Sequence, residues 1–595
     1  MTGFDWAIVL LYFVASAGVG VYYTRRAGRS VEEFFLSGRN LPWWLAGTSM
    51  VATTFAADTP LAVTELVAKN GIAGNWLWWN MAFGAVATVF FFARFWRRAG
   101  ILTDVELVEI RYSGKPAAWL RGIRGLYLGL FINCVIMGWV NLAMAAILEG
   151  LLGVPHDQVL WWVGGILALT AMYSALSGLW GVTVTDAFQF VLAMAGTTVL
   201  AVIVVQLPQV GGIAGLKTHL PEWAFRMTPG IGAPAGASAV GGALMMSAAS
   251  FFAFVGIQWW ASWYPGAEPG GGGYIAQRMM SARDERHAVF ATLWFTIAHY
   301  CVRPWPWIVT GLATLVLYPD LAPDAKRLGY VYAMRDYLPA GLLGLLVASF
   351  LAAYMSTIST QLNWGASYVI NDVYRRFVRP SADQRELVRV SRFTTIVIMG
   401  LSLVVTALLG TISGAWTFII EAGAGLGLVL ILRWFWWRVN AWSELVAMVA
   451  PLLVLAFVRT QTTIGFPESL YLIVGATTVA WLVATFATPA VDQATLVAFY
   501  RRVRPGGPGW KPVAAQCPEV RPDAGFGWLF VDWIAGVALV YAVLFAVGSA
   551  IFGEWAHAAW LATVAAACAA VLVRSLLRLT EADRVSTDRT PLRLP

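Results

Sequence analysis

The chain has 595 residues, of which 59% are hydrophobic and only 12% are charged, and its mean hydropathy is +0.68. Soluble domains of ordinary size cannot bury that much apolar surface, so the composition excludes soluble enzymes and soluble DNA-binding proteins and predicts a membrane protein. The net charge of +8 does not indicate nucleic-acid binding, because the 40 lysines and arginines lie between hydrophobic runs rather than on a polar domain.

The first hydrophobic run, about residues 4–23, has no basic residue before it and is followed at once by Arg25, Arg26 and Arg29. This order of charges favours a retained first helix with an outside N-terminus over a cleaved signal peptide. A transmembrane helix needs about 20 apolar residues. By this measure further spans are expected at 43–69, 74–98, 122–152, 158–177, 180–207, 238–264, 288–318, 338–374, 391–411, 414–437, 441–459, 467–488, 528–553 and 555–577.

The basic residues are distributed unequally between the two sides of this map of about fifteen spans. Only seven lie in the connections on the outer side: Lys69, Lys217, Arg226, Lys326, Arg327, Arg335 and Arg459. An excess of lysine and arginine marks cytoplasmic connections. The distribution therefore supports an outside N-terminus and a cytoplasmic C-terminus in the cell (inner or plasma) membrane. A transmembrane barrel is excluded because the hydrophobic runs are continuous rather than alternating.

Two spans are interrupted by polar or helix-breaking residues. The run 43–69 is cut between Thr53 and Pro60, and the run 238–264 leads into Pro265, Pro269 and four glycines at 270–273. These are the first helices of two five-helix halves, 43–207 and 238–437. Paired interruptions of this kind are typical of a transporter site between inverted repeats. The alternative for the second one is a glycine-rich cytoplasmic loop after an ordinary helix.

Charged side chains inside the spans are further candidates for function, because each costs about 2.5–3.5 kcal/mol at the bilayer centre on insertion scales. They are Asp58, Asp186, Arg303 and Glu421. For Arg303, pairing with Glu421 or another buried acid is favoured over a clamp for a substrate carboxylate.

A stripe of hydroxyl side chains follows one face of the run 338–374. Its members are Ser349, Ser356, Thr357 and Thr360. Together with a carboxylate and the carbonyls freed by a broken helix, such hydroxyls could hold a hard cation. Their spacing alone is better explained by hydroxyls that bond back to the preceding helical turn.

An ordered series of short motifs resembles the sodium:solute symporter family, which includes sodium/sugar, sodium/proline and sodium/sialic acid cotransporters. The resemblance covers about residues 34–442. The motifs are 35–39 before Pro42, the 52–54 stretch, Thr103 to Tyr112, Thr185 and Asp186 with Gln189, Tyr274 to Arg278, and Ala353 to Thr357 ahead of Asn371, Asp372 and Tyr374. The resemblance to this family implies an all-α polytopic protein with a LeuT-type 5+5 inverted-repeat core, one extra N-terminal helix and about four extra C-terminal helices.

The same resemblance implies a sodium site. Its ligands would be the carbonyls of Ala52, Phe55 and Ala353 and the hydroxyls of Ser356 and Thr357. Asp186 matches the family aspartate on the sodium exit path, which in some members helps to hold a second sodium with a hydroxyl at the position of Ala353. Because that hydroxyl is missing, one co-transported sodium is expected.

The solute is less well determined. In sugar-carrying relatives a carboxylate and a glutamine contact the sugar, and the matching positions here are Trp78 and Ile420. The candidate lining is aromatic with a few hydrogen-bonding groups: Asp58, Thr59, Trp78, Asn80, Asn133, Gln258, Trp259, Trp263 and Glu421. Tryptophan rings suit sugars and polyols but also cationic or aromatic solutes, and interfacial anchoring explains many of them equally well.

The expected organisation is an extra helix with its connection at 1–42, a first repeat at 43–207, an outer loop at 208–237, a second repeat at 238–437, and C-terminal helices at 438–595 with a cytoplasmic loop at 489–527. The expected function is sodium-coupled symport of a sugar or polyol by alternating access, with no obligate protein partner. Proton coupling, an amino-acid or carboxylate solute, and a transporter-like sensor are the alternatives. No catalytic constellation points to an enzyme.

Overall fold

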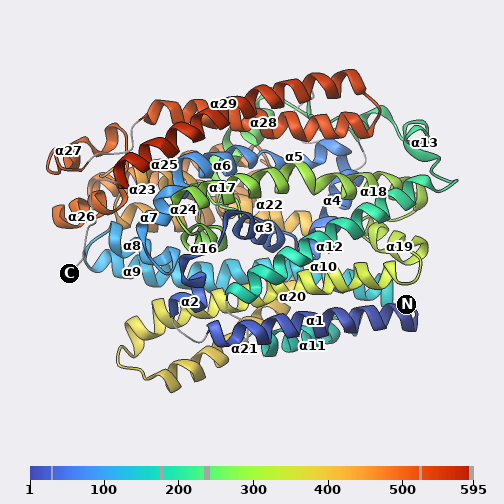
Figure 1. Cartoon of the computed structure of the whole chain (residues 1–595), viewed down its shortest axis with the longest axis horizontal. Helices are drawn as coiled ribbons and strands as arrows, with labels where there is room; N and C mark the ends of the chain where they lie inside the picture. The colour runs from blue at the N-terminus through green and yellow to red at the C-terminus, as the bar shows by residue number, and fades with distance from the viewer. Residues whose placement is uncertain (28–30, 175–178, 233–241, 521–524, 588–595) are drawn as a thin grey trace.

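The computed structural model describes residues 1–27, 31–174, 179–232, 242–520 and 525–587. Its long helices run side by side along the longest axis of the molecule (Figure 1). The helices of the first half are α1 (Gly3–Ala27), α2 (Val31–Leu36), α3 (Trp43–Thr53), α4 (Asp58–Asn70), α5 (Trp76–Trp79), α6 (Ala82–Ala87), α7 (Ala93–Ala99), α8 (Leu107–Arg111), α9 (Gly114–Leu126), α10 (Asn133–Leu152), α11 (Val159–Ser174), α12 (Leu179–Gln206) and α13 (Gly212–His219).

The helices of the second half are α14 (Ala248–Phe251), α15 (Gln258–Ala261), α16 (Gly273–Ser281), α17 (Glu285–Ile297), α18 (Pro304–Leu317), α19 (Leu328–Tyr337), α20 (Leu342–Tyr368), α21 (Gln384–Leu408), α22 (Ile412–Ala422), α23 (Leu426–Phe435), α24 (Ala441–Gln461), α25 (Ser469–Ala487), α26 (Gln493–Val503), α27 (Lys511–Ala514), α28 (Phe526–Ile551) and α29 (Trp555–Thr587). Two short strands, β1 (Gly230–Ile231) and β2 (Met245–Met246), pair in parallel.

Several long helices contain or continue into π-helical stretches. These are η3 (Thr88–Phe92), η5 (Tyr127–Ile132), η7 (Phe252–Ile257), η8 (Ala298–Val302) and η10 (Val369–Val378). Short 3₁₀ turns are η1 (Ser37–Arg39), η2 (Ile72–Asn75), η4 (Asp104–Glu106), η6 (Glu222–Phe225), η9 (Pro323–Ala325) and η11 (Pro508–Trp510). A π-helical turn carries one extra residue and often marks a functional position in a helix.

The outer helices expose apolar side chains, as expected of a surface that contacts lipid. Examples are Leu11 on α1, Leu408 on α21, Val479 on α25 and Trp560 on α29. Within the described residues, nine helices are long and apolar enough to cross a membrane, or ten if the bent pair α22 and α23 counts as one span. The predicted number of about fifteen is not reached by this measure, partly because breaks divide some expected spans into pieces too short to pass, and it stays a prediction.

Both predicted interruptions are present. Helix α3 ends at Thr53 and α4 begins at Asp58, and α15 ends at Ala261 before α16 begins at Gly273. None of residues 262–272 is exposed and most are buried, so this segment is an unwound part of the core rather than a surface loop. The expected span 414–437 corresponds to α22 and α23, which meet at an angle of 52°, a bend that the sequence did not predict.

The unwound segments after α15 and α22 are joined by backbone hydrogen bonds. The N–H of Trp263 donates to the carbonyl of Gly423 (3.2 Å), and the N–H of Gly425 donates to the carbonyl of Ala261 (2.8 Å). Gly425 has a φ of +95°, which a residue with a side chain rarely adopts, and a Cβ at Gly423 would lie 2.8 Å from the Trp263 carbonyl. The two glycines therefore permit the close approach.

Two sequence expectations for the connecting regions need correction. The helix expected from about residue 238 begins at Ala248, where the Ser247 side chain accepts a hydrogen bond from the Ser250 N–H and caps the first turn; residues 233–241 lie outside the described ranges. The expected loop 489–527 contains the short helix α26, whose buried positions recur at helical spacing at Leu496, Phe499, Tyr500 and Val503.

Helix α1 packs against α12 and α20. The buried Asp5 carboxylate accepts hydrogen bonds from the N–H groups of Gly341 (2.7 Å) and Gly344 (2.9 Å), which are free donors at the start of α20. The C-terminal helices form two antiparallel pairs, α24 with α25 and α28 with α29. In Figure 1 the N-terminus lies at the end of the bundle near α13 and α19, and α26 and α27 lie at the opposite end.

Candidate functional site

The break between α3 and α4 borders a cavity of about 70 Å³ in the core. The segment from Thr54 to Ala57 is unwound, and the carbonyl of Ala52 accepts a hydrogen bond from the Phe55 N–H (2.9 Å). The cavity is lined by Thr53, Thr54, Ala56, Asp58, Thr59, Trp78, Met81, Ile136, Trp139, Val140, Tyr264, Pro265, Gly266, Ala267, Tyr274, His299, Tyr300, Arg303, Thr357, Gln361 and Trp416. Residues from both unwound segments, 54–57 and 262–272, therefore face the same space.

Helix α20 carries the predicted hydroxyl pair, but only Thr357 lines this cavity, and Ser356 lines a separate one with Thr185 and Gln189. Thr357 is buried and lines the cavity, and its hydroxyl has no hydrogen-bond partner among the described residues. The neighbouring Ser356 hydroxyl instead donates to the Asp186 carboxylate at 2.8 Å. Ala52, Phe55 and Ala353 are all buried. A buried hydroxyl without a partner is unfavourable, so Thr357 is placed to bind something that the protein itself does not supply.

Asp186, near the start of α12, connects α3 to α20. Its two carboxylate oxygens accept hydrogen bonds from the hydroxyls of Ser49 (2.7 Å) and Ser356 (2.8 Å). The Arg278 guanidinium from α16 lies 3.8 Å from the same carboxylate. Asp186 is thus in direct contact with one of the predicted sodium ligands and close to a buried positive charge.

The cavity contains a second cluster that sequence reasoning did not assemble, formed by Thr54, His299 and Arg303. Arg303 Nη1 donates to the Thr54 hydroxyl (2.9 Å), and its Nη2 lies 3.3 Å from His299 Nε2. Since the guanidinium can only donate, His299 accepts through Nε2 and carries its proton on Nδ1, 3.1 Å from the Thr54 oxygen. The ring is therefore neutral in this arrangement.

The local sequence explains why these side chains point into the cavity. Pro304 has no N–H, and the Arg303 N–H bonds five residues back to the Ala298 carbonyl at 3.2 Å, as in a π-helix. His299 and Arg303 lie four residues apart and share one face. The aromatic rings of Trp78 and Trp307 lie 5.9 Å and 5.4 Å from the guanidinium carbon.

Of the predicted solute contacts, Asp58, Thr59 and Trp78 line the cavity. The others have different neighbours. The Asn80 amide donates to the Trp76 carbonyl, and the Gln258 amide donates to the Leu77 carbonyl. The Asn133 amide donates to the carbonyls of Gly129 and Gln361. Trp259 stacks on Phe83, and the Trp263 N–H donates to the Gly423 carbonyl. None of these five is a lining residue of this cavity.

Glu421 also lies apart from the cavity. It pairs with Arg459 of α24 and accepts a hydrogen bond from the Ser469 hydroxyl at 2.6 Å. Of the two partners expected for Arg303, Glu421 or another buried acid, Glu421 is wrong, because the surface-facing Arg459 neutralises it.

The lining residues that sequence reasoning missed are mainly aromatic and amide groups: Trp139, Tyr264, Tyr274, His299, Tyr300, Gln361 and Trp416. His299 had a usable signal, because it lies one helical turn before Arg303 in an otherwise apolar run. Tyr264 and Tyr274 flank the second interruption. The remaining ones had no local signal, since they are joined only by the tertiary packing.

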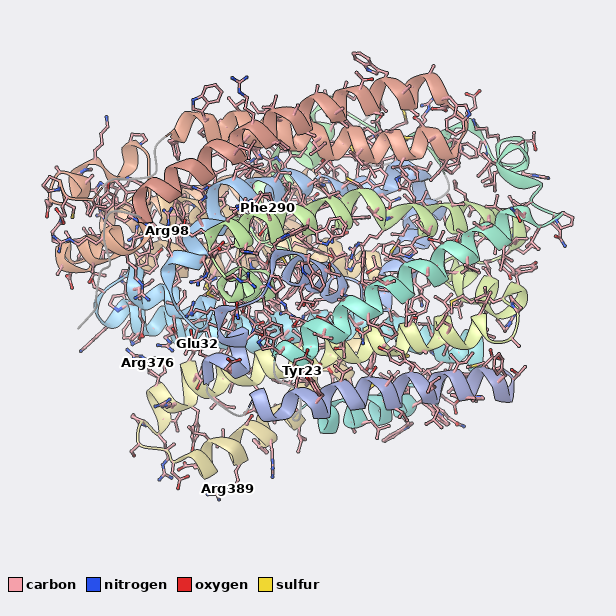
Figure 2. All side chains as sticks on the ribbon, in the orientation of Figure 1. Tyr23, Glu32, Arg98, Phe290, Arg376 and Arg389 are labelled. Atoms are coloured by element: carbon pink, nitrogen blue, oxygen red, sulfur yellow. The ribbon has the colours of Figure 1, made fainter. Side chains whose placement is uncertain are left out.

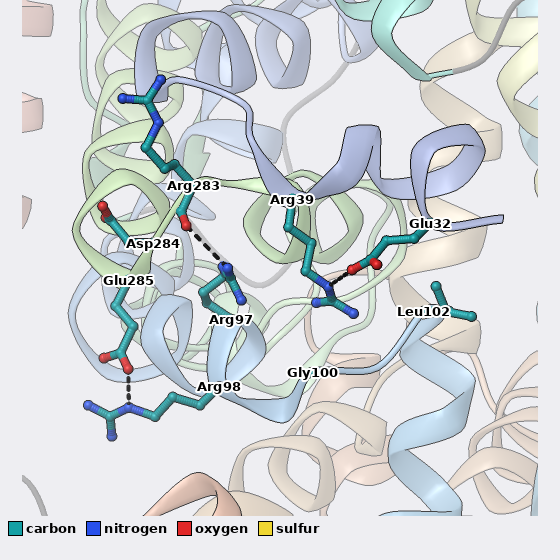
Figure 3. Close-up of a pocket in the computed structure, with 9 residues that line it drawn as sticks. All are labelled: Glu32, Arg39, Arg97, Arg98, Gly100, Leu102, Arg283, Asp284 and Glu285. Atoms are coloured by element: carbon teal, nitrogen blue, oxygen red, sulfur yellow. Dashed lines mark hydrogen bonds and ion pairs between the residues drawn. The ribbon is translucent and has the colours of Figure 1, made fainter. Parts of the chain in front are cut away.

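A larger hollow of about 830 Å³ lies elsewhere, where α7 and the start of α17 meet the turn at Ser37–Arg39 (Figure 3). Its charged groups pair mostly with one another: Arg39 with Glu32 (2.5 Å) and Arg98 with Glu285 (2.7 Å), while Arg97 donates to the backbone carbonyls of Ala282 and Arg283. This hollow is an open, solvated mouth and not an enclosed site for a solute.

Helices interrupted around an enclosed cavity, inside a bundle with an apolar outer surface, define a membrane transporter. The sequence model of the sodium:solute symporter family matches residues 34–450, and the chain belongs to this family. It is a multi-pass membrane symporter in which sodium is the coupled ion, and not an enzyme.

Curated relatives agree with this family. A sodium/mannose cotransporter of Bos taurus is 26% identical over 79% of this chain and 82% of its own. A sodium/glucose cotransporter of Vibrio parahaemolyticus is 25% identical over 75% and 83%, and a sodium/myo-inositol cotransporter 2 of Oryctolagus cuniculus is 25% identical over 76% and 69%.

Among solved structures, a Na⁺-coupled sialic acid symporter in a substrate-bound outward-open state matches with a TM-score of 0.63. The match covers 82% of this chain and 99% of that one at 18% identity. At this identity the likeness concerns the fold, and the expected LeuT-type fold is confirmed.

Proposed function

We propose that the solute is polyhydroxylated, a sugar or polyol, and that it binds at the α3–α4 break in a state in which the cavity, about 70 Å³ here, is wider. The observation that carries this proposal is the cavity wall, in which Trp78 and other aromatic rings surround polar groups of Asp58 and Thr59. Aromatic faces pack against sugar rings while the polar groups bond to hydroxyls. The cotransporters of mannose, glucose and myo-inositol among the relatives support the same solute class.

For sodium we propose a single site made by the carbonyls of Ala52, Phe55 and Ala353 and the hydroxyls of Ser356 and Thr357. The unsatisfied Thr357 hydroxyl beside the unwound segment supports it. One sodium entering down about 100 mV contributes about 2.3 kcal/mol, and a tenfold concentration gradient adds about 1.4 kcal/mol. One ion per cycle is therefore enough to accumulate a neutral solute several hundredfold.

We propose that Asp186 assists sodium release rather than holding a second ion. Its contact with Ser356 places a negative charge next to the proposed cage, where it attracts a departing cation. Ala353 has no side-chain oxygen that could complete a second site around this carboxylate.

Transport by the purified chain in proteoliposomes tests the proposed function. An inward sodium gradient is expected to drive accumulation of a radiolabelled sugar or polyol from a mixed panel, and the chain alone is expected to suffice because no protein partner is part of the proposal. A proton gradient without sodium is expected to drive none. Accumulation that follows the proton gradient, or the absence of sodium-driven uptake for every solute in the panel, would contradict the proposal.

For orientation we propose an outside N-terminus and a cytoplasmic C-terminus in the cell membrane. Glu32, Arg98, Arg376 and Arg389 lie toward the end of the bundle opposite the N-terminus (Figure 2), which agrees with cytoplasmic connections rich in arginine. A reporter fused after Arg379 is expected to be active only in the cytoplasm, and one fused near Asp320 only outside. Reversed labelling of the two fusions would overturn the orientation.

A further inference from the structure

The cavity wall holds a buried positive charge that no carboxylate of the described residues contacts. Arg303 is only 3% exposed, yet no carboxylate oxygen of this part of the chain lies within 4 Å of its guanidinium. Asp58, 4% exposed, lines the same cavity and interacts with Arg303 electrostatically but without forming an ion pair at that distance. Charged groups inside membranes are normally paired, so the arrangement indicates that a ligand completes it.

The guanidinium is held in place but not saturated. Nη1 donates to the Thr54 hydroxyl and to the Val51 carbonyl, and Nη2 donates to His299, whereas Nε has no hydrogen-bond partner among the described residues. Because Nη2 carries a second hydrogen, the Nε–Nη2 edge can still donate, and this edge binds carboxylates with two parallel N–H···O bonds. The rings of Trp78 and Trp307 restrict the guanidinium from two sides. The result is a guanidinium with an unused donor, and a carboxylate reaches Nε once the neighbouring side chains move, because less than 1 Å² of this atom is accessible.

Within the lining of this cavity only Asp58 offsets the charge of Arg303, and it does so from beyond ion-pair distance. His299 accepts from the guanidinium and is neutral, and the other residues that line this cavity, Asp58 apart, carry no formal charge. Binding of a monoanion together with one sodium adds no net charge to the cavity. A neutral sugar would instead add the sodium charge alone next to Arg303.

We propose that the solute carries a carboxylate, which binds the Arg303 guanidinium, while its hydroxyl groups contact Asp58 and Thr59 and its body packs on Trp78. The solute class is then a sugar acid, such as an aldonate or a uronate, rather than a neutral sugar. This inference rests on the proposed function and replaces its neutral solute by an anion, so that transport with one sodium moves no net charge and is driven by the sodium concentration gradient alone.

Matched pairs of solutes that differ in one carboxylate test the inference on the unaltered protein. Thermal stability of the purified chain in sodium is measured against glucose and glucuronate, and against sorbitol and gluconate. An acid is expected to stabilise the protein at about tenfold lower concentration than its neutral partner, since charge-assisted hydrogen bonds contribute about 1.5–3 kcal/mol. Equal potency of the members of both pairs, or stabilisation by no acid, overturns the inference.

Variants at Arg303 locate the effect. Arg303→Gln is expected to remove the preference for the acid, and Arg303→Lys to retain part of it, because lysine keeps the charge but not the two-bond geometry. The control is Arg335→Gln, since Arg335 is far more exposed and pairs with Asp336 away from the cavity. An acid preference that persists at full strength in a folded Arg303→Gln protein contradicts the assignment.

Uptake distinguishes failure of this inference from failure of the proposed function. If neutral sugars enter proteoliposomes under a sodium gradient and sugar acids do not compete, the carboxylate inference is wrong and the proposed function stands. If neither class enters under sodium, the proposed function is wrong as well. Sodium-driven uptake that sugar acids inhibit more strongly than neutral sugars do supports both the proposed function and the carboxylate inference.

Discussion

Thr357→Val is expected to raise the sodium concentration for half-maximal uptake by about tenfold or more, because polar contacts to a charged group contribute about 1.5–3 kcal/mol. Valine keeps the shape of threonine and removes only the hydroxyl. In the structure this hydroxyl bonds to nothing in the described part of the chain, so the free energy of unfolding without sodium is expected to change by less than about 1 kcal/mol. Sodium-dependent uptake and thermal stability with and without sodium are the measurements.

The matched control is Ser349→Ala on the same helix. The Ser349 hydroxyl donates to the Leu345 carbonyl one turn earlier (2.9 Å), so it is satisfied within α20. Its removal is expected to leave the sodium response unchanged. If Thr357→Val shows the same sodium dependence as the unaltered chain, the Thr357 hydroxyl is not a sodium ligand and the proposed cage must be abandoned.

Asp186→Asn is expected to lower the rate of uptake more than it lowers sodium affinity. The amide preserves the shape but offers one acceptor oxygen in place of two, and it removes the charge that attracts sodium as the ion leaves Ser356. It also leaves Arg278 buried without its counter-charge, and breaking a buried pair costs about 3–5 kcal/mol. Initial uptake rate and sodium-dependent thermal shift are compared in the same preparation.

The double variant Asp186→Asn with Arg278→Gln separates the two effects. It removes both charges and is expected to recover stability without recovering the rate of uptake. Equal loss of sodium affinity and rate in the single variant would make Asp186 a direct ligand and would favour a second sodium site despite Ala353. Recovery of the rate in the double variant would show that the carboxylate serves only to neutralise Arg278.

Local sequence was sufficient to predict the interruptions of the core helices. The polar residues and Pro60 in one run, and Pro265 with the following glycines in the other, remove hydrogen-bond donors or favour non-helical backbone, and both effects act over a few residues. The bend between α22 and α23 was not predicted, because it depends on Gly423 and Gly425 meeting another segment 160 residues earlier in the chain.

The candidate site was only partly predictable. Asp58 and Thr357 could be found because a charge or a hydroxyl in an apolar run is conspicuous in itself. The partners of Glu421 and Arg303 could not be found from the sequence, since the identity of each partner depends on which helices pack together. Arg459 lies on α24, and Thr54 and His299 reach Arg303 only when the first break folds against the π-helical turn before α18.

The hydrogen bonds between Trp263 and Gly423 and between Gly425 and Ala261 have a mechanical consequence. Each unwound segment would serve as a joint if it were alone, with the halves on either side free to tilt independently. The two backbone bonds link the end of α15 to the start of α23. A movement of one unwound segment relative to the other must break these bonds or carry both segments together, so the two breaks are coupled rather than independent.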